Sequence, residues 1–482
     1  MLTNTVFSSI NKLANSRVFF PLVVVVWLAV TLPLVNLGYG SDVDAWIVAN
    51  NGENIWESHT YSSSRSMGFP LFELAITPLV HLGGWMASNL ASVVAGLFFL
   101  GAVWALVRLR HLRHSQLTFL VLAFHPLIII NSTTTMDYVW AVSSLGWAYV
   151  ALLSNKPLAA GVLIGIATGF RPTSILFAGP AILWFAWQRQ WKYAAIVAAI
   201  SLLMAVFAYS PALIEYGLST DRTSGILPGD LSAKDLVLLM GYNLTFAIGL
   251  LQTVWVVGLI SIVLWRRRNI PAVNSSAPDP FLPFHLAVVF IWIALFLTLP
   301  VEPEYLLPAF LSLLLLCDRF LSARLMAVTV ILLLSYHLVR VDLLGGESGD
   351  RRVQANIEAG YTIAHIQERR HILSIRELST EYDPPTKTIL MYGEASTPLQ
   401  NDAWARDSDL DLWYQIDGDF YVTLETADLE TLRFWSEKGF RIVAWNKRKS
   451  FLTRSGDEWR KYVEIVELED FFGRRVKGKI FQ

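Results

Sequence analysis

Residues 19–37 read FFPLVVVVWLAVTLPLVNL, an apolar run that contains no charged side chain. A helix rises about 1.5 Å per residue, so this run is long enough to cross the hydrocarbon core of a bilayer. The chain continues with Ser41-Asp42-Val43-Asp44-Ala45-Trp46, which places two carboxylates just beyond the membrane. Further along, residues 61–70 read YSSSRSMGFP and bring Arg65, hydroxyl groups and turn-forming residues to the same surface. These stretches predict a polar site at the membrane edge.

The composition of the chain is that of a membrane protein. Of its 482 residues, 54% are hydrophobic and 16% are charged, and the mean hydropathy is +0.46. Soluble domains carry about 25% charged residues. The net charge of -1 gives no general attraction to nucleic acid, so we expect no nucleic-acid partner. A single cysteine, Cys317, excludes a disulfide within the chain and a cysteine-based metal site.

The apolar runs predict an α-helical polytopic membrane protein with about 11 transmembrane helices. The expected spans are 18–38, 88–108, 116–131, 137–153, 157–170, 173–187, 192–210, 241–265, 282–300, 304–320 and 323–342. Several are shorter than the roughly 17 residues that a spanning helix needs. These are expected to be reentrant or to end inside a cavity lined by protein.

Lysine and arginine set the expected orientation, because short cytoplasmic loops hold an excess of both. With the N-terminus in the cytoplasm, thirteen of them flank the inner ends of the spans and five lie outside, ahead of the tail. The first outer loop, 38–87, and the tail then share the extracytoplasmic side of a bacterial or archaeal plasma (inner) membrane. We expect a membrane domain over residues 1–343 and an extracytoplasmic soluble domain over 344–482.

The tail has the pattern of a small α/β domain. Charge density rises and apolar runs shorten after Gly345-Gly346. Strands are expected at 388–392, 420–424 and 441–445, with a helix at 427–438 that ends at Gly439. Strand, helix and strand in this order form a small layer with its own core. No catalytic motif is visible in it, so packing or recruitment of an acceptor is its expected role.

Two later motifs complete the pattern: residues 161–173 read GVLIGIATGFRPT and residues 302–309 read EPEYLLPA. With the two stretches of the first outer loop, they resemble the GT-C class of polytopic membrane glycosyltransferases. The branch in question contains protein O-mannosyltransferases and the lipid A aminoarabinose transferase, and the resemblance covers about residues 18–340 in layout. It implies transfer of a hexosyl or pentosyl group from a polyprenyl-phosphate donor to an extracytoplasmic lipid, glycan or protein, with inversion at the anomeric carbon.

The resemblance assigns the general base to Asp44 or Asp42. Relatives often have Asp-Glu in the first outer loop, whereas here Asp44 is followed by Ala45 and the second acid precedes it. We favour Asp44, because the continuation Asp-Ala-Trp is more similar to the family pattern. A carboxylate within hydrogen-bond reach can take the proton of an acceptor hydroxyl. For each aspartate the alternative is to cap the helix that begins near Ala45.

The leaving phosphate needs positive charge, which Arg171 and Arg65 are expected to supply. A guanidinium offers a planar fork of donors and stays charged. Arg171 lies in a short outer turn ahead of Pro172, and an arginine at membrane depth is costly unless it is paired or faces water. The alternative for both arginines is a structural ion pair or a side chain that extends to the membrane surface.

Acidic residues of the outer side are the candidates for acceptor or sugar contacts. Asp137 is expected to hold a site arginine or to contact the acceptor, with helix capping as the alternative. Glu73 lies in a short apolar segment, 71–82, expected along the membrane surface, where it faces lipid headgroups or forms a wall of the site. Glu302, Glu304 and Tyr305 are a cluster in which relatives more often carry arginine or histidine, so sugar or acceptor contact is favoured over phosphate contact.

No metal and no other cofactor is expected, although Asp42 and Asp44 are residue types that could hold a divalent cation. The rival function is a membrane transporter or lipid-linked sugar flippase without transferase activity, which would also explain Arg171 and the broken spans. Against it, the sequence shows no matching half-repeats, and its polar residues gather at the outer face.

Overall fold

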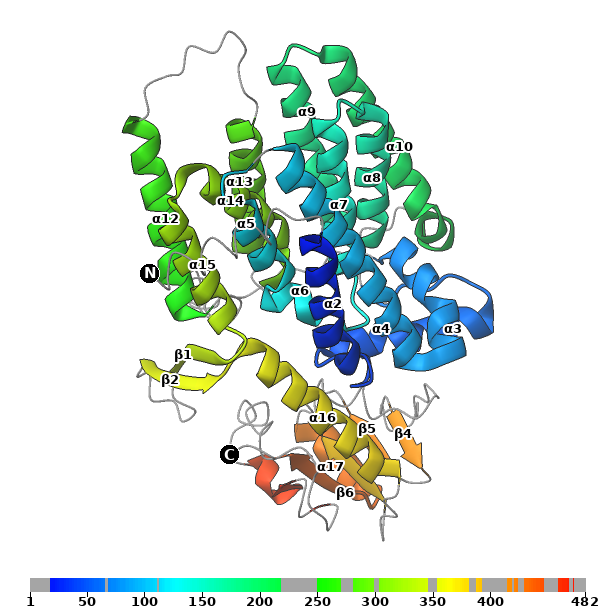
Figure 1. Ribbon diagram of the computed structural model, residues 1–482. Helices are drawn as coiled ribbons and strands as arrows, with labels where there is room; N and C mark the ends of the chain where they lie inside the picture. The colour runs from blue at the N-terminus through cyan, green and yellow to red at the C-terminus, as the bar shows by residue number, and fades with distance from the viewer. Residues whose placement is uncertain are drawn as a thin grey trace. The chain divides into compact units, whose positions relative to one another are not determined.

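The structure is a computed structural model that describes residues 18–65, 68–110, 112–217, 249–269, 281–298, 303–345, 353–380, 387–391, 414–417, 420–423, 429–445, 458–467 and 471. It forms two compact units (Figure 1). The helical unit comprises residues 1–36 and 51–364, and the second unit comprises residues 37–50 and 365–482. The chain passes from one to the other within helix α16, and residues 38–50 of the predicted first outer loop belong to the second unit.

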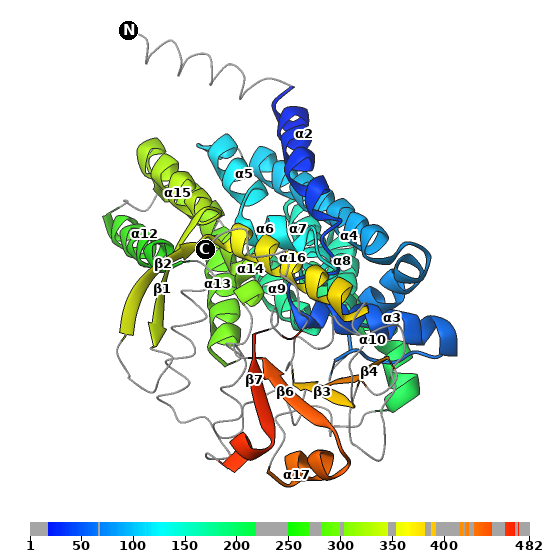
Figure 2. The same ribbon diagram turned by 90° about the horizontal axis from the view of Figure 1, so that it is seen from below.

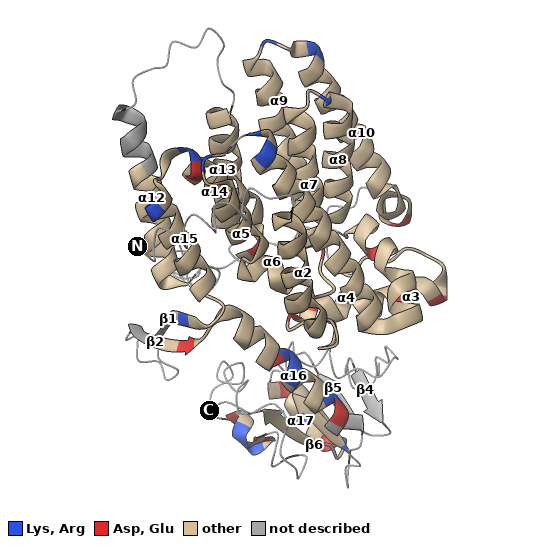
Figure 3. Ribbon diagram, in the orientation of Figure 1, with Lys and Arg blue, Asp and Glu red and all other residues tan. Residues whose placement is uncertain are grey.

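The helical unit consists mainly of apolar helices, which confirms the predicted helical fold. Its elements are α2 (Phe19–Thr31), η1 (Leu32–Leu34), the larger part of α3 (Val43–Ser58), α4 (Pro70–Leu109), α5 (Ser115–Ala123), α6 (Pro126–Asn131), α7 (Tyr138–Leu153), α8 (Pro157–Phe170), η2 (Pro172–Phe177), α9 (Ala178–Trp187), α10 (Trp191–Tyr216), α12 (Leu250–Asn269), α13 (Phe281–Thr298), η4 (Pro303–Leu306), α14 (Leu307–Phe320) and α15 (Ala323–Ser335). Helices α7, α8 and α9 contain no charged residue. Helix α10 has two charged residues, Lys192 and Glu215, and both lie near its ends (Figure 3).

Helix α8 packs closely on α10 through small residues spaced four apart. A Cβ added at Gly161 would lie 2.8 Å from Cβ of Ile200, and one at Gly165 would clash with Cβ of Met204. Glycines of this spacing let two apolar helices approach without a strong hydrophobic drive. The motif at 161–173 therefore has a packing role along most of its length, and its polar end is Arg171.

Two helices of the described residues, Pro70–Leu109 and Trp191–Tyr216, are long and apolar enough to cross a membrane by length and composition. Helix α4 changes direction at Gly84 (φ 56°), so the predicted surface segment 71–82 is its first part. The count of eleven spans stays a prediction.

Two predicted spans end differently in the structure. The run 116–131 is broken at His125, whose side chain caps α6 and whose successor Pro126 cannot continue α5. The predicted span 323–342 is wrong beyond Ser335, where helix α15 ends. Val339–Gly345 is instead strand β1, which pairs antiparallel with β2 (Val353–Ala359). Arg340 and Glu358 lie directly opposite in this pair and form an ion pair at 2.9 Å.

The start of α5 is held by a carboxylate from α14. Fully buried Asp318 accepts the backbone N–H groups of Arg113 and His114, both at 2.8 Å, and the hydroxyl of Thr118 at 2.9 Å. The first N–H groups of a helix lack partners within it, and an acid there also suits the helix dipole.

The second unit contains a five-stranded sheet of order β4-β5-β3-β6-β7. The elements are most of α16 (Tyr361–Thr380), β3 (Thr388–Met391), β4 (Tyr414–Asp417), β5 (Phe420–Thr423), α17 (Leu429–Glu437), β6 (Arg441–Trp445) and β7 (Val463–Val466). Strand β3 is parallel to β5 and β6, β7 is parallel to β6, and β4 is antiparallel. Helices α16 and α17 cover opposite faces of the sheet (Figure 2). The predicted strands and helix are present, and Gly439 (φ 84°) follows α17 as expected. The extracytoplasmic location of this part stays a prediction.

Candidate functional site

Asp137 lies at the centre of a cluster of charged side chains in the helical unit. It directly precedes α7, and its side chain is fully buried. Its Oδ1 accepts a hydrogen bond from Nη2 of Arg65 at 2.7 Å, and its Oδ2 accepts one from Nη1 of Arg171 at 2.6 Å. The carboxylate does not cap α7, so the capping alternative is wrong. One acid holds two arginines from distant loops.

Arg171 reaches the cluster because the chain breaks between α8 and η2. A residue before proline is driven out of the helical region, and Arg171, ahead of Pro172, has φ -149° and ψ 118°. Its guanidinium carbon lies 3.8 Å from the ring centre of Tyr138 and 4.5 Å from that of Tyr305. Stacking on two rings fixes the plane of the guanidinium and adds attraction from their faces.

The cluster brings the guanidiniums of Arg65 and Arg171 to the one carboxylate of Asp137. Burial acts to raise the pKa of Asp137, but the guanidiniums of Arg171 and Arg65 outweigh it and hold that pKa below its ordinary value of 3.8. The side chains of Arg65 and Arg171 are 15% and 6% exposed, so water screens their charge weakly. The ion-pair alternative for both arginines is therefore met. Two guanidiniums held side by side also offer N–H donors of the kind that bind an anion such as a phosphate.

Glu73 fixes the loop that carries Arg65. It is fully buried, so the prediction that it faces headgroups is wrong. Its carboxylate accepts the hydroxyl of Tyr61 at 2.6 Å, the backbone N–H of Ser64 at 2.7 Å and the backbone N–H of Phe69 at 2.9 Å. Burial and the nearby carboxylate raise the pKa of Tyr61, which keeps its hydroxyl a donor. The observed role of Glu73 is thus to hold residues 61–65 and Phe69 in place.

Helix α10 holds the same loop from another side. The hydroxyl of Tyr216 accepts the backbone N–H of Ser63 at 3.0 Å, and the hydroxyl of Tyr209 donates to the carbonyl of Gly68 at 3.1 Å. Gly68 has φ 68°, a conformation that L side chains rarely adopt. Arg65 thus lies in a loop whose backbone is fixed on both sides.

Glu304 and Tyr305, in η4, border the cluster at Arg171. They line a cavity of about 20 Å³ together with Tyr138 and Arg171, which is room for about one water molecule. Oε1 of Glu304 accepts the hydroxyl of Tyr361 at 2.9 Å. Burial raises the pKa of Glu304 despite that hydrogen bond. Glu302 lies outside the described residues.

Asp42 and Asp44 belong to the second unit. The backbone N–H of Asp44 donates to Oδ1 of Asp42 at 2.9 Å, so Asp42 caps the start of α3, as the alternative for it proposed. Asp42 is exposed, whereas Asp44 lies in the first turn of the helix and is partly buried.

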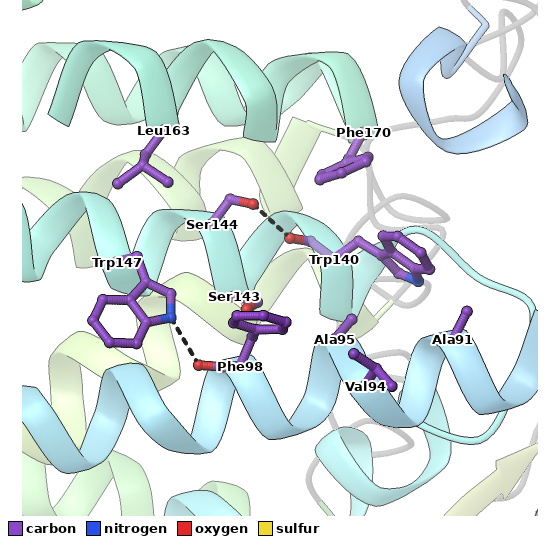
Figure 4. A pocket seen from close by; sticks show the side chains of 10 residues that line it. All are labelled: Ala91, Val94, Ala95, Phe98, Trp140, Ser143, Ser144, Trp147, Leu163 and Phe170. Atoms are coloured by element: carbon purple, nitrogen blue, oxygen red, sulfur yellow. Dashed lines mark hydrogen bonds between the residues drawn. The ribbon is translucent and has the colours of Figure 1, made fainter. Parts of the chain in front are cut away.

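A larger, apolar cavity of about 610 Å³ lies between α4, α7 and α8 (Figure 4). Its lining includes Trp140, Trp147, Leu163 and Phe170, and the last of these directly precedes Arg171. The indole N–H of Trp147 donates to the carbonyl of Phe98 at 2.9 Å, which leaves its ring as an apolar wall. The dimensions and lining suit a hydrocarbon chain.

Six of the predicted site residues that the structure describes therefore lie in the helical unit. Five form the cluster and its border, namely Asp137, Arg65, Arg171, Glu304 and Tyr305, and Glu73 holds the loop of Arg65. Sequence reasoning missed the aromatic support, which consists of Phe69, Tyr138, Tyr209 and Tyr216. The position of Tyr138 next to Asp137 was the one available signal. Within the described ranges, no three His, Cys, Asp or Glu side chains are grouped so that they could hold a metal ion.

Comparison with known proteins gives a likeness of fold. No protein-family model and no curated protein matches the sequence. A crystal structure of ArnT from Cupriavidus metallidurans bound to undecaprenyl phosphate is similar with a TM-score of 0.51 and 13% identity, over 95% of this chain and 91% of that one. A crystal structure of ArnT from Cupriavidus metallidurans in the apo state is similar with a TM-score of 0.51 and 12% identity, over 93% of this chain and 89% of that one. The predicted resemblance to the GT-C branch of the lipid A aminoarabinose transferase is thereby confirmed at the level of the fold.

Proposed function

We propose that this protein is an integral membrane glycosyltransferase that moves a sugar from a polyprenyl-phosphate carrier to an extracytoplasmic acceptor. The observation that carries the proposal is the cluster in which Arg65 and Arg171 share the single carboxylate of Asp137. The fold shared with ArnT, which has been crystallised with undecaprenyl phosphate, supports the same class of donor.

The two guanidiniums would bind the donor phosphate. Their positive charge is held in place before the substrate arrives, since both Asp137 oxygens and the stacked rings fix their positions. Preorganised positive charge stabilises the negative charge that grows on the departing phosphate, and it costs little reorganisation during the reaction. Asp137 is thus a positioning residue for Arg65 and Arg171, and Glu73 acts in the same way through its hydrogen bonds to Tyr61, Ser64 and Phe69.

We assign the general base to Asp44. Asp42 uses an oxygen to cap α3, which leaves the less exposed Asp44 as the better candidate. In a single displacement, Asp44 would take the proton of an acceptor hydroxyl, and the hydroxyl oxygen would attack the anomeric carbon. The bond from that carbon to the phosphate oxygen breaks, polyprenyl phosphate leaves, and the configuration inverts.

The apolar cavity between α4, α7 and α8 supports a lipid substrate, because its walls offer an apolar surface to a hydrocarbon chain. One of its lining residues is Phe170, which directly precedes Arg171. In this proposal the N-terminus is cytoplasmic, and the acceptor is reached from outside an inner membrane. The transferred group is a hexose or a pentose. The membrane domain would cover residues 1–343, with the soluble domain after it, and Glu304 and Tyr305 would contact the sugar or the acceptor.

The test is transfer by the purified protein in lipid nanodiscs, supplied with a panel of radiolabelled polyprenyl-phosphate sugars and a membrane extract as the source of acceptor. We expect a labelled product with the natural protein, with product formation reduced at least about 100-fold in Asp44→Asn and in Arg171→Met. Glu57→Gln, an exposed acid on α3, is the matched control and should keep full activity. Labelled lipid that crosses liposome membranes without a glycosidic product would overturn the proposal in favour of a transporter or flippase.

A further inference from the structure

Residues 37–46, which carry both aspartates, are held by one face of α16 within the second unit. Three side chains of α16 contact this segment, at positions 365, 369 and 376. Residues four and seven positions apart lie on the same face of a helix, so these three form a single row. The contacts join parts of the chain that are more than 300 residues apart in sequence.

Arg369 makes the central contact. Its side chain is buried, with 1% of the residue exposed, and its guanidinium bonds the backbone of the segment. Nε donates to the carbonyl of Leu37 at 3.0 Å, and Nη2 donates to the carbonyl of Gly38 at 3.0 Å. Burial lowers the pKa of Arg369 to about 9, which reflects the cost of keeping this charge away from water. A buried guanidinium that donates hydrogen bonds to two successive carbonyl groups fixes the path of the backbone there.

The neighbouring contacts fix the residues on either side of the first aspartate. The hydroxyl of Ser41 shares a hydrogen bond with Nδ1 of His365. The guanidinium of Arg376 lies over the ring of Trp46, with its central carbon 5.6 Å from the ring centre. Ser41 and Trp46 bracket the run from Asp42 to Ala45, so both ends of the acidic turn are held.

Packing inside the segment adds to this restraint. Gly38 has φ 77°, and a Cβ there would lie 3.0 Å from Cζ2 of Trp46 and 3.3 Å from Cδ2 of Leu373. The indole N–H of Trp46 donates to the carbonyl of Gly40 at 2.9 Å. The chain therefore folds tightly over Trp46 before α3 begins.

We propose that α16 is the positioning element for the catalytic aspartate, with Arg369 as its key positioning residue. The inference rests on the proposed function, in which Asp44 is the general base. The second unit then has a part in the reaction itself, because its helix sets where the carboxylate of Asp44 meets the acceptor hydroxyl. Donor phosphate binding uses Arg65 and Arg171 of the helical unit and does not depend on Arg369.

This division of roles predicts a split between kinetic constants. A displacement of about 1 Å in a reacting group can cost about 100-fold in rate. Arg369→Met should lower kcat by about 10- to 100-fold and leave the KM for the donor within about twofold. Arg369→Lys keeps the charge but loses the planar fork, so its kcat should fall between those of the natural protein and Arg369→Met.

The control is Arg370→Met, a substitution of the adjacent, exposed arginine of the same helix. Two measurements are made on the full-length protein in nanodiscs. Hydrogen exchange with mass spectrometry should show faster exchange of the amides of residues 37–50 in Arg369→Met and unchanged exchange in Arg370→Met. In the Asp44→Asn background, adding Arg369→Met should change the residual rate by less than about twofold, because the group that it positions is already gone.

Equal exchange and equal kcat in the Arg369→Met and Arg370→Met variants would overturn the inference. So would an Arg369→Met effect that is as large in the Asp44→Asn background as in the natural protein, since that indicates general destabilisation. If Arg369→Met fails to fold, the same comparisons are made with Arg369→Lys. If the natural protein transfers no sugar, the proposed function fails on its own, and the exchange of residues 37–50 decides whether Arg369 positions the segment.

Discussion

Asp137→Asn is the substitution that most directly tests the charged cluster. It keeps the size of the side chain but removes the negative charge that Arg65 and Arg171 share at 2.7 and 2.6 Å. Two largely buried guanidiniums then remain beside each other without their common counter-charge. We expect a large loss of stability together with a loss of transfer.

The size of the loss follows from the two hydrogen bonds. Hydrogen bonds to charged groups contribute about 1.5–3 kcal/mol each, so two of them amount to about 3–6 kcal/mol. The side chain of Asn still has one acceptor oxygen, so one of the two hydrogen bonds can remain. The expected loss of stability therefore lies toward the lower end of that range. Removal of one partner from a buried ion pair typically costs about 3–5 kcal/mol, in agreement with this figure. We therefore expect Asp137→Asn to lower the free energy of unfolding by about 3–4 kcal/mol.

The assay is equilibrium unfolding in mixed micelles, combined with initial rates of transfer, and Glu57→Gln serves again as the control. The double variant Asp137→Asn/Arg171→Met should be more stable than Asp137→Asn alone, because it removes a buried charge that has lost its partner. An Asp137→Asn protein that unfolds within about 1 kcal/mol of the natural one would refute the reasoning. Strict additivity of the two substitutions would do the same.

Three other predictions follow from the site. Glu73→Gln replaces one acceptor oxygen by a donor, so the loop that carries Arg65 should loosen. In initial-rate measurements the KM for the donor should rise about tenfold, or about 1.4 kcal/mol, which lies within the cost of a lost hydrogen bond. An unchanged KM would contradict the role of Glu73. The Asp137 carboxylate has a folded pKa below 3.8, so its contribution to stability is complete above that pH and is lost as the pH falls toward the lowered pKa. Unfolding measured from pH 7 downward should therefore show the gap between the natural protein and Asp137→Asn closing below about pH 4, and a gap that stays constant there speaks against the ion pairs. Treatment with EDTA should leave the transfer rate unchanged, and a loss restored by added Mg²⁺ would assign a metal to the reaction.

The helices were predictable from sequence where local chemistry decides their ends. Pro157 begins α8 and Arg171-Pro172 ends it, since proline fits the first turn of a helix and restricts the residue before it. The end of α15 at Ser335 was not predictable in this way. The apolar residues at 338, 339, 341, 343 and 344 made the span seem to continue despite Arg340 and Asp342, but residues 339–345 form a strand that pairs with β2. A count of apolar residues does not show whether a segment will pair with the strand that follows it.

The same limit applies to the site. Arg171 stood out because an arginine at membrane depth needs a partner, and Arg65 and Asp137 stood out as charged residues of outer loops. The three prove to be one another's partners. Glu73 was misjudged because its partners come from a loop that precedes it and folds back over it. The sequence contains no indication that Arg369 is buried. Arginines on an amphipathic helix are normally solvated, and nothing in the sequence distinguishes Arg369 from the adjacent, exposed Arg370.

The carboxylate of Asp318 at the head of α5 has a consequence for biosynthesis. The ribosome makes Arg113 and His114 some 205 and 204 residues before it makes the acid that binds their amides. Until then, water or the insertion machinery must satisfy those amides. Completion of α14 therefore supplies the acceptor for the start of α5, and a chain truncated ahead of residue 318 would lack it.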